Sequence, residues 1–437
     1  MLKKEKKVKE KKSKNTRSLR WEKLDNTALI FPVIAGEDMT NTYRLSMELS
    51  EDIRPELLQE ALSMILPKFS GFNVRLRMGV FWYYFEENNK PAPPVMEETL
   101  FPCRYIRPNK NNSYLFNVTY YKNRINLEVF HVLADGMGGM NFLRELTYQY
   151  LRLVHPELKG QVEDKFSDVT SLNTEDSFEK YYKKNVGSSY QKGNAYTIKL
   201  KKLDAGEFGV MHGLINIPEL KVVTKQYGAS INEYLVAVFA WSTYVNCLKK
   251  MPSKYPVRIA VPVNLRSYFP SNTTRNFFVM VSAKFHPTKE EYTFEEVLHI
   301  IQESLRKQIQ KDNLEEIFSL SVANQKNKLL RMVPLGLKNL VMRFVYNRSA
   351  LANTTTITNI GSWKMEEPYG AYVKMIRAFL PMSKGQNIKG TINSYKDTLV
   401  FTFTSIFSDT SLQREFFRKI AEDGVTIQIE TNGVYYE

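Results

Sequence analysis

Residues 114 to 151 constrain the fold more tightly than any other part of the 437-residue chain. Tyr114 to Tyr121 and Arg124 to Phe130 alternate in the manner of two strands joined by a two-residue turn, which predicts a β-hairpin. A glycine cluster follows, and apolar residues then recur at helical spacing as far as Leu151. The order of strand, strand, turn and helix predicts a sheet flanked by helices, and hence an α+β fold.

A histidine stands where the second strand ends. His131 is followed by Asp135 and Gly136, and the glycines allow the chain to turn tightly behind it. A neutral imidazole titrates near about 6.5, so it can take a proton from an alcohol or an amine near neutral pH. His131 is therefore our candidate general base, and the alternative is a packing or surface histidine beside an ordinary turn. From the residues alone, Asp135 could be the orienting partner of a triad.

The length of the chain predicts two halves, because 437 residues exceed one ordinary core. Residues 156–195 are polar, and we place the boundary there. The expected division is a basic disordered tail over 1–20, an N-terminal subdomain over 21–195 that carries His131, and a C-terminal subdomain over 196–437.

The positive charge of the chain is concentrated at its start. Residues 1–20 hold ten Lys or Arg against Glu5 and Glu10, a net of +8 out of +15 for the whole chain. A run of this kind is usually a solvated tail, and the remainder of the charge is spread thinly. We expect no nucleic-acid partner, and contact of the tail with an anionic membrane surface stays open.

Apolar patterning and cysteine usage predict the compartment. No stretch approaches the roughly 18 uninterrupted apolar residues of a membrane span, and no apolar run follows the basic start as a secretory signal requires. Cys103 and Cys247 are the only cysteines, in segments that we predict as strand and helix, so we expect packed thiols and neither a disulfide framework nor a metal site. These features favour the cytoplasm, with a peripheral position at the inner membrane surface as an alternative.

Further elements follow from periodicity. Ser230 and Glu233 have the capping-box spacing, which predicts the start of an apolar helix. Elsewhere we predict strands over 43–49, 258–265, 354–360 and 398–406, an extended segment over 75–85, and helices over 51–66 and 293–309.

One segment of mixed character has two interpretations. Lys328 to Arg348 combines apolar residues with five basic ones. We predict core-facing helices broken at Pro334 and Gly336. A position on a membrane surface near a lipidic substrate is the alternative.

The histidine segment carries a resemblance to a known family. His131-Val132-Leu133-Ala134-Asp135-Gly136 resembles the HxxxDG active-site motif of the CoA-dependent acyltransferase superfamily, which includes chloramphenicol acetyltransferase, peptide-synthetase condensation domains and alcohol acetyltransferases. The alcohol acetyltransferase branch is the most similar. The resemblance covers nearly the whole chain after the tail, in the order Leu24-Asp25-Asn26, Gly79-Val80-Phe81-Trp82, the motif, Ala229-Ser230-Ile231-Asn232, Val261-Pro262-Val263-Asn264-Leu265-Arg266, Arg275-Asn276-Phe277 and Ile357-Thr358-Asn359-Ile360-Gly361.

This resemblance implies a fold and a reaction. It implies two chloramphenicol acetyltransferase-like subdomains, each a mixed sheet flanked by helices, with an active-site tunnel between them. His131 would activate a hydroxyl or amine acceptor, including a small alcohol or a lipid, against an acyl thioester in a ternary complex. Acyl-CoA would be the co-substrate, with no bound cofactor, and an acyl carrier protein is the alternative donor.

The resemblance also implies roles for individual residues. Asp135 would make a structural ion pair with an arginine of the other half, for which Arg266 is the candidate, and Gly136 would keep the approach to the site open. Thr358 and Asn359 lie where relatives carry a pair beside the tunnel, so they are candidate oxyanion donors. The alternative is a strand end with a turn glycine.

One departure from the family pattern and one competing motif bear on what the resemblance implies. Condensation domains usually carry a second histidine before the catalytic one, where this chain has Phe130, which argues against a peptide-synthetase role. Gly136, Gly138 and Gly139 follow a predicted strand, but their spacing does not fit a dinucleotide-binding loop. A non-catalytic binding module of the same fold and a carrier-protein-dependent condensation-type enzyme remain the alternative functions.

Overall fold

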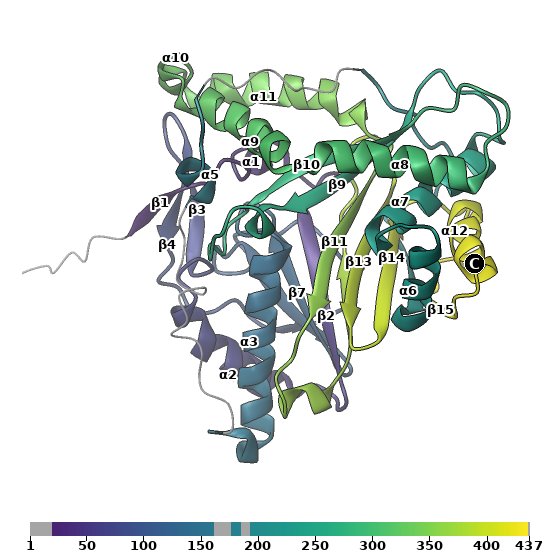
Figure 1. The fold of residues 1–437 in the computed structure, drawn as a ribbon. Helices are drawn as coiled ribbons and strands as arrows, with labels where there is room; N and C mark the ends of the chain where they lie inside the picture. The colour runs from purple at the N-terminus through teal and green to yellow at the C-terminus, as the bar shows by residue number, and fades with distance from the viewer. Residues whose placement is uncertain (1–19, 161–175, 185–192, 436–437) are drawn as a thin grey trace, which may run out of the picture.

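The computed structural model describes residues 20–160, 176–184 and 193–435. Apart from Arg20, the tail predicted over residues 1–20 lies outside them. The described chain is α+β, as predicted, with one sheet in each half and a third, small sheet at one edge of the molecule (Figure 1).

The sheet of the first half has five strands in the order β12-β2-β7-β6-β5. The predicted hairpin is present as β6 and β7, which pair antiparallel. Helix α3 packs against α2 and lies in front of β2 and β7 (Figure 1). The bounds are β2 (Thr42–Leu49), α2 (Pro55–Ile65), β5 (Met96–Glu97), β6 (Phe116–Tyr121), β7 (Arg124–Phe130) and α3 (Gly136–Val154).

The sheet of the second half has seven strands in the order β10-β9-β11-β13-β14-β8-β15, and β11 is parallel to both of its neighbours. The bounds of its strands are β8 (Gly209–Asn216), β9 (Val257–Asn264), β10 (Phe278–Phe285), β11 (Thr355–Trp363), β13 (Ile388–Tyr395), β14 (Thr398–Ser405) and β15 (Ile427–Thr431). The strands predicted over 258–265, 354–360 and 398–406 are therefore confirmed.

The helices of the second half include an apolar one, α7, whose residues are almost all buried. The predicted capping box at its start is present, since Ser230 and Glu233 bond to each other's backbone N–H groups. The helix bounds are α5 (Ser177–Lys180), α6 (Ile217–Gln226), α7 (Ile231–Ser242), α8 (Phe294–Gln308), α9 (Lys311–Lys326), α10 (Lys328–Met332), α11 (Leu335–Ser349) and α12 (Ser411–Glu422), and α1 (Phe31–Ile34) belongs to the first half.

The small sheet has the order β1-β4-β3, with β1 (Trp21–Lys23), β3 (Val74–Met78) and β4 (Tyr83–Glu87). The segment predicted as extended over 75–85 is instead a hairpin. The chain turns because Gly79 N–H donates to the carbonyl of Trp82 at 2.9 Å. A Cβ at Gly79 would stand 3.0 Å from that carbonyl oxygen, so glycine suits the turn.

One strand crosses between the halves. β12 (Val373–Phe379) comes from the second half of the chain, yet it pairs antiparallel with β2 and completes the sheet of the first half. Arg377 on this strand forms ion pairs with Glu48 at 2.6 Å and with Glu430 at 2.7 Å, which lie on β2 and β15. The two halves therefore share a strand as well as an interface.

The segment 328–348 departs from its prediction. It forms two helices separated at Pro334, but Gly336 lies inside α11 and does not break it. Large apolar side chains along both helices are exposed rather than core-facing. The reason is that periodicity shows which residues share a face of a helix and says nothing of what covers that face. No helix in the described ranges is both long and apolar enough to cross a membrane.

Cys103 also departs from its prediction. It is buried, as expected of a packed thiol, but it lies in a loop with a positive φ of 63° rather than in a strand. The preceding Pro102 has no N–H to donate to a strand ladder. Cys247 ends a π-helical segment, Thr243–Cys247, that continues α7, so the prediction of a helix there is confirmed; the thiol is half-buried, and burial raises its pKa to about 12.

Candidate active site

His131 follows β7 directly and is half-buried among aromatic rings. Its backbone N–H donates to the carbonyl of Asn41 at 2.9 Å. Phe31 stacks on the imidazole with a centroid separation of 4.8 Å, and Tyr43 meets it edge-on at 5.2 Å. Phe278 at the start of β10 approaches at 5.6 Å. These three rings fix the plane of the imidazole, and they come from both halves of the chain.

Asn276 determines which ring nitrogen of His131 carries the proton. The amide oxygen Oδ1 of Asn276 lies 3.0 Å from Nδ1 of His131. The amide nitrogen Nδ2 of Asn276 donates to the carbonyl of His131 at 3.2 Å and to Oδ2 of Asp25 at 3.0 Å. Because both of these partners are acceptors, the group facing the ring must be the amide oxygen, so Nδ1 carries the hydrogen. Nε2 is left with its lone pair.

Burial keeps this imidazole neutral. It lowers the pKa of His131 below the ordinary value of 6.5, against the opposing effects of the Asp135 charge and the Asn276 hydrogen bond. A histidine with a lowered pKa is a free base at neutral pH. The ring is therefore in the protonation state and the tautomer that a general base requires.

Asp25 stands behind Asn276 and is buried. It accepts the backbone N–H of Ala28 at 2.7 Å through Oδ1. Burial raises the pKa of this carboxyl to about 7, although the hydrogen bond from Asn276 opposes the shift. Asp25, Asn276 and His131 form a continuous chain of hydrogen bonds that ends at Nε2, which has no hydrogen-bond partner among the described residues.

Asp25 and Asn276 were not predicted as site residues. Both stand in segments that carry the family resemblance, but neither segment indicates a role for them. They are 251 positions apart, and no local pattern indicates that they meet. Their position within two of the ordered segments was the only available signal.

Asp135 is occupied by partners other than the imidazole. As N-cap of α3 it accepts the N–H of Gly138 at 3.1 Å through Oδ1. Its Oδ2 accepts from Nη1 of Arg266 at 2.8 Å and from the N–H of Phe277 at 3.1 Å. These bonds give Asp135 a structural position between the halves, whereas the triad interpretation required it to face Nδ1 of His131, where Asn276 lies.

Arg266 is the arginine that the sequence analysis named for this ion pair. It follows β9, and its guanidinium is largely buried. Its remaining donors bond to the carbonyls of Thr273 at 2.9 Å and Arg275 at 2.7 Å, and to the side chain of Asn264. A guanidinium held in this way has a fixed position, so the ion pair with Asp135 also fixes the loop that carries Asn276.

β11 runs beside the start of α3. A Cβ on Gly136 would lie 3.6 Å from the side chain of Ile360, an ordinary contact. The strand bulges between Asn359 and Gly361, and Oδ1 of the exposed Asn359 accepts the N–H of Gly361 at 2.8 Å. Thr358 is half-buried on the same strand. The structure thus brings the predicted pair to the vicinity of the motif.

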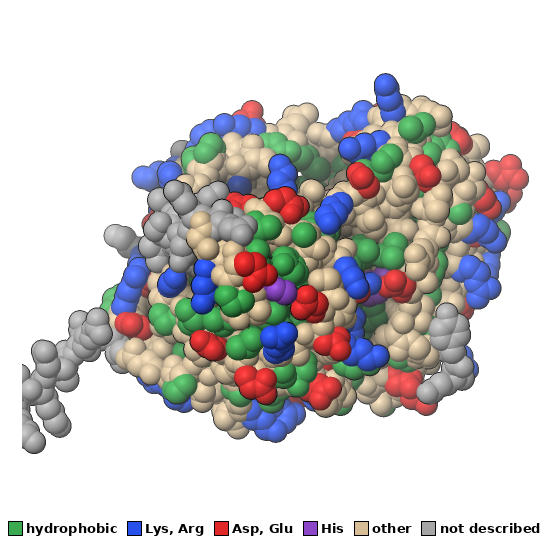
Figure 2. Space-filling model, turned by 90° about the horizontal axis from the view of Figure 1, so that it is seen from below, with side chains coloured by type: hydrophobic (Ala, Val, Ile, Leu, Met, Phe, Trp, Pro, Cys, Tyr) green, Lys and Arg blue, Asp and Glu red, His purple; other side chains and the backbone are tan. Residues whose placement is uncertain are grey.

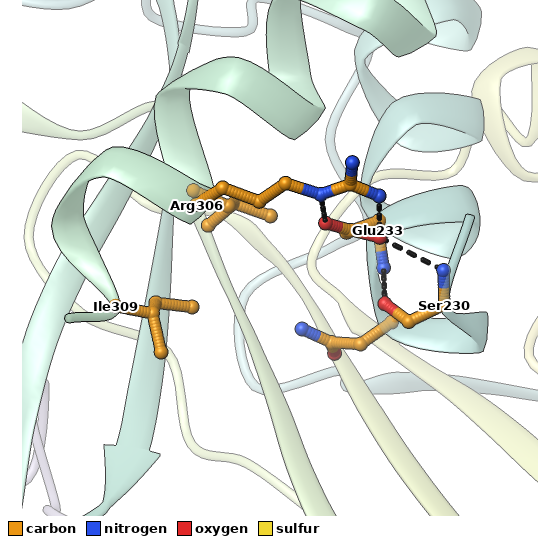
Figure 3. A pocket seen from close by; sticks show the side chains of 6 residues that line it. Ser230, Glu233, Arg306 and Ile309 are labelled. Carbon is orange, nitrogen blue, oxygen red and sulfur yellow. Dashed lines mark hydrogen bonds and ion pairs between the residues drawn. The ribbon is translucent and has the colours of Figure 1, made fainter. Parts of the chain in front are cut away.

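A separate pocket of about 230 Å³ lies in the second half, between the start of α7 and the end of α8 (Figure 3). Its polar side chains already bond to one another: Arg306 Nε donates to Glu233 at 2.7 Å, and Glu233 and Ser230 form the capping box of α7. None of its lining residues belongs to the surroundings of His131. Within the described residues, no cluster of three His, Cys, Asp or Glu side chains suited to a metal ion is present either.

Comparisons with known proteins identify the fold. No protein-family model and no curated protein sequence matches this chain. Solved structures do match: TRI101 of F. graminearum, complexed with coenzyme A and deoxynivalenol, has a TM-score of 0.64 at 10% identity, covering 93% of this chain and 99% of that one.

Two further structures match over similar spans. Polyketide synthase associated protein 5 from Mycobacterium tuberculosis has a TM-score of 0.57 at 13% identity, with 91% of this chain and 96% of that one covered. The first condensation domain of the CDA synthetase has a TM-score of 0.55 at 12% identity, with 94% and 99% covered. The chain therefore has the two-subdomain, chloramphenicol acetyltransferase-like fold that these structures share.

Proposed function

We propose that the protein is an acyltransferase that moves an acyl group from an acyl-CoA to a hydroxyl or amine acceptor, with His131 as the general base. The observation that carries this proposal is the free Nε2 of His131, whose lone pair is left available because Asn276 holds the hydrogen on Nδ1. The shared fold supports it, since TRI101, a structure of this fold, is complexed with coenzyme A.

The proposed reaction needs one proton acceptor and no covalent enzyme intermediate. Nε2 of His131 takes the proton of the acceptor while the acceptor oxygen or nitrogen attacks the carbonyl carbon of the thioester. The tetrahedral intermediate collapses, the carbon–sulfur bond breaks, and the CoA thiolate receives the proton from the imidazolium. The charge of Asp135 favours the imidazolium during this step, because it opposes the lowering of the His131 pKa.

The developing oxyanion needs a hydrogen-bond donor. Thr358 and Asn359 are our candidates, because β11 places them next to Ile360, which contacts the start of α3. With Oδ1 of Asn359 turned to the N–H of Gly361, the amide NH₂ points away from that bond and can donate elsewhere. Removal of one such donor typically lowers kcat by about 10²- to 10³-fold.

The finer assignment is an alcohol O-acetyltransferase, acting in the cytoplasm with acyl-CoA as co-substrate. This assignment rests on the motif resemblance. It is tested by offering alcohols and amines as acceptors and acyl-CoAs of different chain length as donors. An acyl carrier protein is the second donor to be offered, since condensation domains are among the structures that share this fold.

The decisive experiment measures thiol release from acyl-CoA donors of graded chain length with pooled alcohols and amines. His131→Ala should lower acceptor-dependent release by about 10²- to 10⁴-fold. His299→Ala is the matched control, because His299 is an exposed histidine on α8. Equal rates for the wild type and His131→Ala would refute the general-base role, and turnover only with a loaded carrier protein would replace acyl-CoA as the donor.

A further inference from the structure

Helices α10 and α11 lie along the top edge of the molecule in Figure 1, and their large apolar side chains form an exposed surface. Such patches are rare on soluble monomers unless they bind something. The turn between β3 and β4 extends this surface, because Leu335 N–H donates to the carbonyl of Val80 at 2.8 Å and Lys338 Nζ donates to that of Phe81 at 2.9 Å. We call the whole the α11 face. Its apolar side chains, each between 38% and 78% exposed, are Met78, Val80, Phe81, Trp82, Leu329, Met332, Leu337, Leu340, Val341, Phe344 and Val345.

The charge of the α11 face has one sign. The segment from Lys328 to Ser349 holds five basic residues and no Asp or Glu. Two of the three acidic residues of the adjoining small sheet are ion-paired, Glu86 with Arg75 and Glu22 with Arg275, and the third, Glu87, lies at the end of β4 away from the β3–β4 turn. By contrast, the face seen from below in Figure 2 intersperses Lys and Arg with Asp and Glu.

The basic tail joins the molecule on the same small sheet. Its last residue, Arg20, precedes β1, which pairs with β4, and Trp21 on β1 is itself 60% exposed. The sequence of residues 1–20 carries a net charge of +8. Because Trp21 pairs with Glu86 and the turn joins Met78 to Tyr83, Arg20 lies at the end of the small sheet away from the β3–β4 turn.

The α11 face is also close to His131. Arg343 Nε donates to the carbonyl of Val33 in α1 at 2.8 Å. Phe31, two residues earlier in the same short helix, stacks on the imidazole. One turn of chain thus separates the apolar surface from the candidate active site.

We propose that the α11 face docks the protein peripherally on an anionic phospholipid bilayer. Exposed Leu, Phe and Trp side chains would enter the headgroup region, and Arg and Lys would pair with lipid phosphates, as interfacial helices do. An acidic protein partner would satisfy the charges, but exposed Leu, Phe and Trp side chains interspersed with Lys and Arg are the pattern of a helix that lies in a membrane interface. The docking does not depend on acyl transfer, since binding is measured without turnover.

The test is co-sedimentation of the full chain with vesicles of phosphatidylcholine, with or without phosphatidylglycerol. The wild type should sediment with the anionic vesicles and lose this binding as salt is added. Leu340→Glu with Phe344→Glu changes two exposed positions one turn apart on α11 and should weaken binding at least about tenfold. The matched control is Val222→Glu with Met251→Glu, which has the same change in charge at equally exposed apolar positions elsewhere and should bind like the wild type.

Three results would overturn the proposal. The first is that the wild type does not bind anionic vesicles, and the second is that the two double variants lose binding equally. The third is that the wild type forms a dimer in sedimentation velocity and that Leu340→Glu with Phe344→Glu makes it monomeric, which would identify a second copy of the chain as the occupant. His131→Ala should bind vesicles as the wild type does, so that a failure of docking and a failure of the acyltransferase assignment are told apart.

Discussion

At the scale of single residues, Asn276 sets the chemistry of the candidate base. An imidazole in this position could present either nitrogen, and the wrong tautomer would offer the acceptor an N–H instead of a lone pair. Asn276 removes the choice because its own amide nitrogen is held by the carbonyl of His131 and by Asp25. Asp25 is thus a positioning residue that acts through Asn276.

Asp25→Asn should reverse this arrangement. The new amide would present an N–H to Asn276 or to Ala28, which favours a flipped Asn276 whose Nδ2 faces the ring. We expect Nε2 of His131 to become protonated and kcat to fall by about 10- to 100-fold with little change in KM. Nitrogen-15 chemical shifts of His131 report the tautomer directly. An unchanged tautomer with unchanged kcat would rule out the positioning role.

The pH dependence of kcat/KM should have only an acid limb in this range. A base with a lowered pKa is neutral at pH 7 and above, so the main loss of activity occurs as the pH falls through the pKa of His131, below 6.5. Asp25, with a pKa of about 7, adds a shallower loss near neutrality because its protonated form no longer polarises Asn276. In Asp25→Asn this upper step should disappear and the lower one remain. A profile that falls on the alkaline side instead would contradict this assignment.

At the scale of elements, β13 carries a lysine inside the protein. Lys389 is buried, and its ammonium donates to the hydroxyl of Ser383 at 2.5 Å rather than to a carboxylate. Burial lowers the pKa of this lysine from 10.5 to about 7. In the unfolded chain the same lysine stays charged up to high pH. Folding must therefore either bury the charged ammonium or remove its proton, and both lower the free energy of unfolding.

Lys389→Met should therefore stabilise the protein. The gain should be about 1 to 3 kcal/mol at pH 7 or below, and it should shrink as the pH rises toward 9, because the free energy needed to remove the proton on folding falls as the pH approaches the unfolded pKa of 10.5. Urea unfolding of the wild type and the variant at several pH values measures the difference. A constant difference across this range would show that the lysine is not held neutral by the fold.

The elements that local patterns specify were predictable. The β6–β7 hairpin follows from alternation, and the start of α7 follows from the spacing of Ser230 and Glu233, since both depend on residues a few positions apart. The Asn276 bond to His131 spans 145 positions and the Asp25 bond 251, so no local pattern could reveal them. The exposure of α11 was not predictable either, because the same apolar spacing suits a helix that faces a core.

At the scale of the whole molecule, Asp135 and Arg266 connect the two halves at the site. Asp135 belongs to the helix behind His131, and Arg266 belongs to the loop that also carries Asn276. The proposed division at residue 195 places them in different subdomains. Their ion pair therefore fixes the position of Asn276 relative to His131.

Asp135→Asn should destabilise the protein by about 3 to 5 kcal/mol, because it leaves the Arg266 guanidinium without its counter-charge. The amide oxygen can still cap α3, so Asp135→Ala should cost about 1 kcal/mol more. Guanidinium chloride unfolding of the pair separates the two effects. Equal stability of Asp135→Asn and the wild type would show that the charge between the halves contributes nothing.

The crossing of β12 bears on how this protein can be divided or recombined. A gene fragment that ends at residue 195 would encode β2 without its neighbour β12 and would leave that edge of β2 unpaired. β2 is a strand of eight residues, and seven of them are buried. Such an edge invites aggregation. Neither half can therefore be exchanged by itself. A chimera that replaces the first half with that of a relative must also replace residues 373–379.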